Sequence, residues 1–76
     1  MTLRCKAECT NVHKKSKSPA FEGIQVGDVI DFSIKIKSVK GCAAYIMCRN
    51  LRTNMVSRLS FNQIVHTLER FEFKEL

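Results

Sequence analysis

Residues 29–37 read Val-Ile-Asp-Phe-Ser-Ile-Lys-Ile-Lys, and from Ile30 onward apolar and polar side chains alternate strictly. Alternation with a period of two is typical of a strand with one buried face, because successive side chains of a strand point to opposite sides of the sheet. We therefore expect the isoleucines and Phe32 to face a core, and Lys35 and Lys37 to face outward.

Shorter segments on both sides of this strand show similar patterns. Residues 2–8 alternate, with apolar residues on one side and charged residues on the other. Residues 43–51 and 55–59 predict two more strands, with a turn at Lys40-Gly41 before the first and a hairpin turn at 52–54 between the two. For residues 43–51 the pattern leaves two inward sets open, which are Ala44, Ile46 and Cys48 or Ala43, Tyr45 and Met47.

Residues 10–27 predict a long basic loop. This stretch contains a Lys/Ser run, one proline and two of the three glycines, and such residues interrupt regular structure. Phe21 and Ile24 are apolar residues within it, and we expect them to anchor the loop to the core.

The periodicity changes near the C-terminal end. Phe61, Ile64, Val65 and Leu68 follow the spacing of one helical stripe, which predicts a helix over residues 60–70 whose stripe lies in the core. Ser60 and a glutamine three residues later fit a capping box at its start. Phe71 and Phe73 then alternate with charged residues and predict a last strand.

Together these elements predict a single mostly β (α+β) domain over residues 1–76, with about five antiparallel strands and one helix before the last strand. The order of elements, and the Gly27-Asp28-Val29-Ile30 start of the second strand, resemble the SH3-like small β-barrels. That resemblance implies a small barrel. The chain has no tryptophan and no aromatic cluster in its first loop, so the proline-rich ligands of SH3 domains do not carry over. An OB-type barrel is the rival fold, but it places its helix after the third strand.

No pattern in the sequence predicts catalysis. Cys5, Cys9 and His13 are spaced by four residues, but on a strand the two cysteines would stand roughly 13 Å apart, too far for one metal ion. The glycines form no phosphate-binding loop. We expect Cys9 and Cys48 to be small core residues in a reducing compartment. The chain is therefore predicted to be a non-enzymatic, cytoplasmic protein with no metal, cofactor, small-molecule substrate or membrane partner.

The distribution of charge favours an anionic partner. The formal net charge is +6, and residues 32–68 contain six basic residues and no acidic one. Basic side chains with an interleaved aromatic residue suit a phosphate backbone with a stacked base. We therefore predict an RNA- or DNA-binding module, with Tyr45 as the stacking residue and the basic residues Lys35, Lys37, Lys40, Arg49, Arg52 and Arg58 as phosphate ligands.

The alternative is a protein-interaction module that acts as a small regulator or inhibitor of a larger protein. A phage-like protein of this kind would place its basic residues on an acidic surface of a host or nucleic-acid-processing protein. Tyr45 and Met47 exposed among lysines would favour nucleic acid. An exposed apolar patch of Met47, Met55 and Val56 would favour a protein partner. The sequence does not choose between RNA, DNA and protein.

Overall fold

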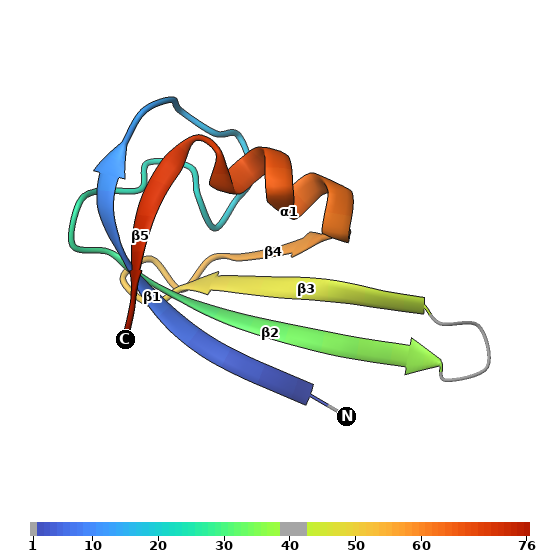
Figure 1. Ribbon diagram of the computed structural model, residues 1–76. Coiled ribbons are helices and arrows are strands. Elements are labelled where there is room, and N and C mark those ends of the chain that lie inside the picture. The colour runs from blue at the N-terminus through green and yellow to red at the C-terminus, as the bar shows by residue number, and fades with distance from the viewer. Residues whose placement is uncertain (1, 39–42) are drawn as a thin grey trace.

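The computed structural model describes residues 2–38 and 43–76. In these residues the number and order of elements agree with the sequence prediction (Figure 1). The predicted turn at Lys40-Gly41 lies outside the described residues. The elements are β1 (Thr2–Val12), β2 (Val29–Ser38), β3 (Ala43–Asn50), β4 (Val56–Leu59), α1 (Phe61–Leu68) and β5 (Phe71–Glu75).

The strands form one antiparallel sheet in the order β4-β3-β2-β1-β5. A closed SH3-like barrel is not confirmed, because the edge strands β4 and β5 are not paired with each other in the part of the chain that the structure describes. Helix α1 instead connects the end of β4 to the start of β5 and packs against both strands and β3, as Figure 1 shows. The fold is therefore a strongly bent open sheet with one short helix over its inner face.

Strand β1 is longer than the predicted segment of residues 2–8. Its second half pairs with β5, and the register shifts between Cys9 and Asn11. One extra residue at such a bulge reverses the alternation of side chains. Because of the bulge, Cys9 and Val12 both pack on the core although they stand three positions apart.

The core lies between the inner face of the sheet, α1 and the long loop. Phe21 is fully buried and stacks on Phe71, with ring centroids 5.6 Å apart and an angle of 14° between the ring planes. Ala20 and Ile24 are also buried, which confirms that this loop is anchored to the core. Cys9 and Cys48 are buried core residues, as predicted.

Helix α1 begins with the predicted capping box. The Ser60 hydroxyl oxygen accepts a hydrogen bond from the Gln63 backbone N–H, and the Gln63 side-chain oxygen accepts one from the Ser60 backbone N–H. The prediction that the whole stripe is core is wrong for Phe61 and Val65, which are 48% and 56% exposed. A two-turn helix over the edge of an open sheet buries only a narrow side, and here Ile64 occupies it. No helix in the described part of the chain has the length and apolar character to cross a membrane.

Candidate functional site

The register of four strands brings basic side chains together on the outer face, which we define as the face of the sheet turned away from α1. Arg4 pairs with Ser33, Lys6 with Asp31, and Asp31 in turn with Arg49. Lys35 pairs with Tyr45, and Arg58 of β4 pairs with Met47. Side chains of directly paired residues stand on the same face. Among the described residues, the basic members of the outer face on β1 to β4 are Arg4, Lys6, Lys35, Arg49 and Arg58.

Asp31 lies in the middle of these basic side chains. It is only 6% exposed, and its Oδ2 atom lies 3.3 Å from Arg4 Nη2 and 3.9 Å from Arg49 Nη2. A buried carboxylate needs such partners, because an unpaired charge is costly to remove from water. Both arginine side chains remain about half exposed or more, so most of their donors remain accessible. A shallow hollow of about 390 Å³ lies over this region.

Tyr45 lies on the outer face near the start of β3, where it pairs with Lys35. Ile46 and Cys48 are buried, which settles the open choice for β3 and turns Tyr45 and Met47 outward. Arg58 stacks over the Tyr45 ring, with its guanidinium carbon 5.2 Å from the ring centroid. This cation–π contact holds a delocalised cation and a partly exposed aromatic ring side by side.

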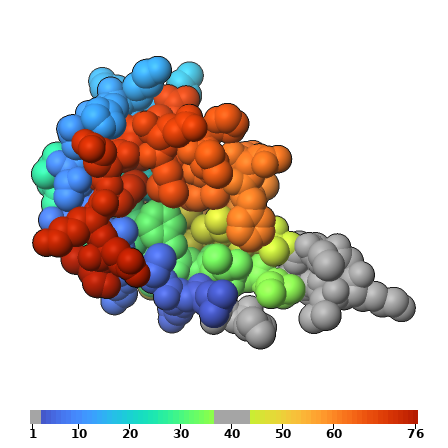
Figure 2. Space-filling view, in the orientation of Figure 1, coloured from blue at the N-terminus to red at the C-terminus, as the bar shows by residue number. Residues whose placement is uncertain are grey.

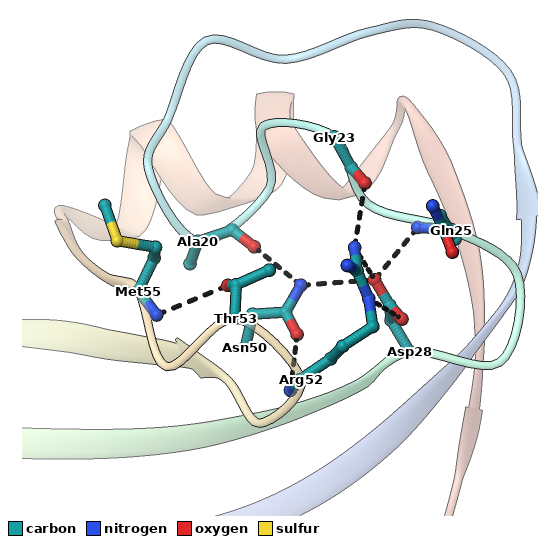
Figure 3. Close-up of polar contacts among 8 residues, drawn as sticks. All are labelled: Ala20, Gly23, Gln25, Asp28, Asn50, Arg52, Thr53 and Met55. Atoms are coloured by element: carbon teal, nitrogen blue, oxygen red, sulfur yellow. Dashed lines mark hydrogen bonds and ion pairs between the residues drawn. The ribbon is translucent and has the colours of Figure 1, made fainter.

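Arg52, which the sequence placed with the other basic residues, does not join the outer face. Its Nε and Nη2 atoms donate hydrogen bonds to Asp28 at 2.7 and 3.0 Å, and Nη2 also donates to the Gly23 carbonyl at 3.0 Å (Figure 3). Arg52 therefore clamps the long loop to the end of β3. Lys40 and the Lys37 side chain lie outside the described residues.

The Arg52 clamp is part of a buried polar network. Asp28 also accepts from the Gln25 backbone N–H at 2.9 Å and from Asn50 Nδ2 at 3.3 Å. The hydrogen bond from Arg52 is the main reason that the pKa of Asp28 lies below its usual value, although burial acts in the opposite direction. Asn50 further donates to the Ala20 carbonyl. This network is structural, because its members are occupied with one another.

Sequence reasoning missed three residues of the outer face, which are Arg4, Lys6 and Asp31. The alternation of residues 2–8 did put both basic side chains on the polar side of their strand. Alternation alone could not show that β1 pairs with β2. This pairing brings the basic side chains of β1 next to those of the neighbouring strands.

A second basic group lies at the long loop and the end of α1. Arg70 donates a hydrogen bond to the Lys15 carbonyl at 2.9 Å, and a surface hollow there includes Lys15, Lys17, His66 and Arg70 in its lining. Two acidic side chains accompany this group, since His13 Nε2 lies 3.1 Å from Glu72 and His66 Nδ1 lies 3.9 Å from Glu69. It is therefore less strongly basic than the outer face.

The cysteines form no reactive or metal-binding cluster in the residues that the structure describes. Burial raises the pKa of the Cys48 thiol to about 12 and also raises that of Cys9. Both thiols are therefore protonated at neutral pH, whereas nucleophiles and metal ligands need the thiolate. Within residues 2–38 and 43–76, no group of three or more histidine, cysteine and acidic residues has the geometry to hold a metal ion.

No protein family, curated protein or solved structure matches the chain.

Proposed function

We propose that this chain is a non-enzymatic cytoplasmic module that binds nucleic acid through the outer face of its sheet. The observation that carries the proposal is the gathering of Arg4, Lys6, Lys35, Arg49 and Arg58 on one face. Phosphate groups along a nucleic-acid backbone are the repeating anions that such a surface can neutralise, and binding then gains from the release of condensed counterions.

Two further features support nucleic acid as the ligand. Arginine guanidinium groups donate bidentate hydrogen bonds to phosphate, and three of the five basic residues are arginines. Tyr45 presents a partly exposed ring beside Lys35 and Arg58. A base stacked on this ring would have cations next to its phosphates, as in proteins that bind single strands.

Asp31 has a positioning role in this proposal. Its carboxylate attracts Arg4 and Arg49 from opposite sides, so both guanidinium groups are held over the centre of the face before the ligand arrives. Less side-chain entropy is then lost on binding. The outer face also has Glu8, which pairs with Lys74 of β5, but the basic side chains still outnumber these two carboxylates and the local charge remains positive.

The proposal is tested by fluorescence anisotropy with labelled single- and double-stranded oligonucleotides of DNA and RNA. The variant Lys35→Glu/Arg58→Glu reverses two charges on the outer face. The matched control Lys14→Glu/Lys17→Glu makes the same change of net charge on exposed loop residues. We expect the first variant to lose at least about tenfold in affinity and the control to lose less than about threefold. The opposite ranking would assign binding to the loop, and absence of binding by the wild-type chain at low salt would refute the proposal.

A protein partner is the second candidate, and one observation favours it. Val56 is exposed on the outer face opposite Arg49, and Met55 is exposed in the adjoining turn. An acidic protein with a small apolar contact would fit this corner of the face. If no oligonucleotide binds, the same two charge-reversal variants should be compared for capture of an acidic protein, as expected for a regulator or inhibitor of a larger enzyme.

A further inference from the structure

The hollow at the centre of the outer face has the size of a small-ligand site. Its volume is about 390 Å³, at the lower end of the range for such sites. Figure 2 shows the other side of the sheet, where α1 (orange) and β5 (red) lie over green side chains of β2. The lining of the outer-face hollow includes Arg4, Asp31, Ser33, Lys35, Met47 and Arg49.

Asp31 brings an acceptor without a partner to this hollow. Its contacts with Arg4 and Arg49 are both made by Oδ2, and no residue in the described part of the chain donates a hydrogen bond to Oδ1. Every fully buried side-chain nitrogen or oxygen in that part of the chain has a hydrogen-bond partner. Oδ1 therefore reaches the surface of the outer face, where Asp31 lines this hollow and an adjoining one beside Lys6.

Ser33 leaves room for a flat ligand beside that acceptor. It pairs with Arg4 on one side and with Met47 on the other. Because it is only 7% exposed, its small side chain lies below the longer side chains around it. Among the described residues its hydroxyl also has no hydrogen-bond partner, so it too reaches the hollow. The thioether of Met47 adds a polarisable apolar contact.

The donors and acceptors around the hollow select among the bases. A guanidinium group only donates hydrogen bonds and a carboxylate only accepts them. Guanine complements both, because its O6 and N7 atoms suit arginine and its Watson–Crick edge adds two adjacent donors, N1–H and the N2 amine. Cytosine and adenine have one amine on that edge. Thymine and uracil have a single N–H between two carbonyl oxygens, which the carboxylate would repel.

We therefore propose that the hollow binds one guanine of a single strand, with Asp31 Oδ1 accepting hydrogen bonds from its N1–H and N2 amine. This inference rests on the proposed function and adds a base preference to phosphate contacts that carry none. Oδ2 keeps its role of positioning Arg4 and Arg49. The base in the hollow is the neighbour of the base that stacks on Tyr45, which stands two positions from Met47 on the same face of β3.

The probes for this proposal are short labelled DNA strands in which thymine alternates with guanine, hypoxanthine or cytosine. Hypoxanthine differs from guanine only in lacking the N2 amine, so this comparison removes one donor and leaves the phosphate charge unchanged. In anisotropy titrations the wild-type chain should bind the guanine strand at least about fivefold more tightly than the hypoxanthine strand. The preference should disappear when both strands are annealed to their complements, because base pairing occupies the same donors.

Two variants of the hollow test the assignment in the protein. In Asp31→Asn the amide oxygen should turn toward the arginines, which only donate, and its nitrogen should then face the donors of guanine. The ratio of guanine to hypoxanthine affinity should fall to about one. Ser33→Ile fills the hollow with a branched side chain that suits a strand and should also lower this ratio to about one, while the salt dependence of binding stays that of the wild type.

Glu8→Gln is the matched control for Asp31→Asn. It removes one acidic charge from the same face, at a residue that pairs with Val29 and Lys74 and does not line the hollow. This variant should keep the base preference of the wild type. A loss of preference caused only by the change of net charge would appear in both variants.

Three results would overturn this inference. They are equal binding of the guanine and hypoxanthine strands by the wild-type chain, a preference that Asp31→Asn retains, and tightest binding of the cytosine strand. If Asp31→Asn does not fold, Ser33→Ile and the comparison of ligands on the wild-type chain decide. Equal binding of all strands would refute the guanine site and leave the proposed function standing, whereas absence of binding to any strand would refute both.

Discussion

Replacement of Asp28 by asparagine should destabilise the fold more than the replacement of Glu22 by glutamine, the other acidic residue between β1 and β2. The Asp28 carboxylate accepts four hydrogen bonds, from the Gln25 N–H, Asn50 Nδ2 and two Arg52 nitrogens. An asparagine can keep its oxygen toward Arg52 Nε. Its amide nitrogen then faces the three donors that Oδ2 satisfied, so these donors lose their acceptor.

The expected cost follows from the burial of this group. A hydrogen bond lost at a buried donor costs roughly 1 kcal/mol or more. The Arg52 side chain is about half exposed, so water replaces part of what it loses. We therefore expect the free energy of unfolding to fall by about 2–3 kcal/mol, out of the roughly 5–15 kcal/mol typical of a domain.

Urea unfolding followed by far-ultraviolet circular dichroism measures this change. With a slope of about 1 kcal/mol per molar urea for a domain of this size, the midpoint should fall by about 2–3 M. Glu22→Gln is the matched control, because it removes one acidic charge from an exposed residue of the same loop and should shift the midpoint by less than about 0.5 M. A midpoint for Asp28→Asn as close to wild type as that of the control would refute this account of the loop clamp.

The same network predicts a pH dependence of stability. The pKa of Asp28 is lower in the folded protein than its ordinary value of 3.8, so the folded state binds fewer protons in that range and stability rises with pH. This contribution is complete above about pH 5 and is lost as the pH falls through 3.8 toward the lower folded pKa. The fall in stability between pH 5 and pH 2 should be smaller in Asp28→Asn than in wild type. An equal fall would mean that other carboxyl groups account for the acid sensitivity.

Three further outcomes are expected. Ser60→Ala removes the side-chain acceptor of the capping box and should lower the free energy of unfolding by about 1 kcal/mol in urea titrations; an unchanged midpoint would argue against the cap. Asn54 has a backbone φ of 62°, so Asn54→Gly should be near neutral while Asn54→Ala lowers the thermal midpoint by a few degrees, roughly 1 kcal/mol; the reverse order would contradict this backbone conformation. Cys5 is exposed and the pKa of Cys48 is raised to about 12, so a thiol reagent at pH 8 should modify Cys5 within minutes and reach Cys48 only in denaturant, as peptide mass analysis would show.

Local patterns in the sequence predicted much of the fold. The alternation around Ile30 and Lys35 indicated which side of β2 faces the core, and Ser60 with Gln63 located the start of α1. These features depend on residues close together in the chain. The extension of β1 to Val12 could not be predicted in this way, because it results from pairing with β5 across some sixty residues and from a bulge that breaks the alternation.

The candidate site was predicted in part for the same reason. Alternation puts Tyr45 and Arg49 on one face of β3, but it left open which face that is. The burial of Ile46 and Cys48, together with the strand register, places them beside Lys35 and Arg58. Arg52 belongs to the same run of positive charge, but its position is determined by Asp28, twenty-four residues earlier. Charge composition alone does not indicate which cations are occupied by an internal partner.

The most direct test of the central claim is the salt dependence of oligonucleotide binding by the wild-type chain. If the five basic side chains of the outer face contact phosphates of a single strand, the slope of log K against log salt should be about −3.5, and it should become shallower by about 1.4 in Lys35→Glu/Arg58→Glu. A slope near zero, or one that the outer-face variant leaves unchanged, would contradict the assignment of this face to nucleic acid.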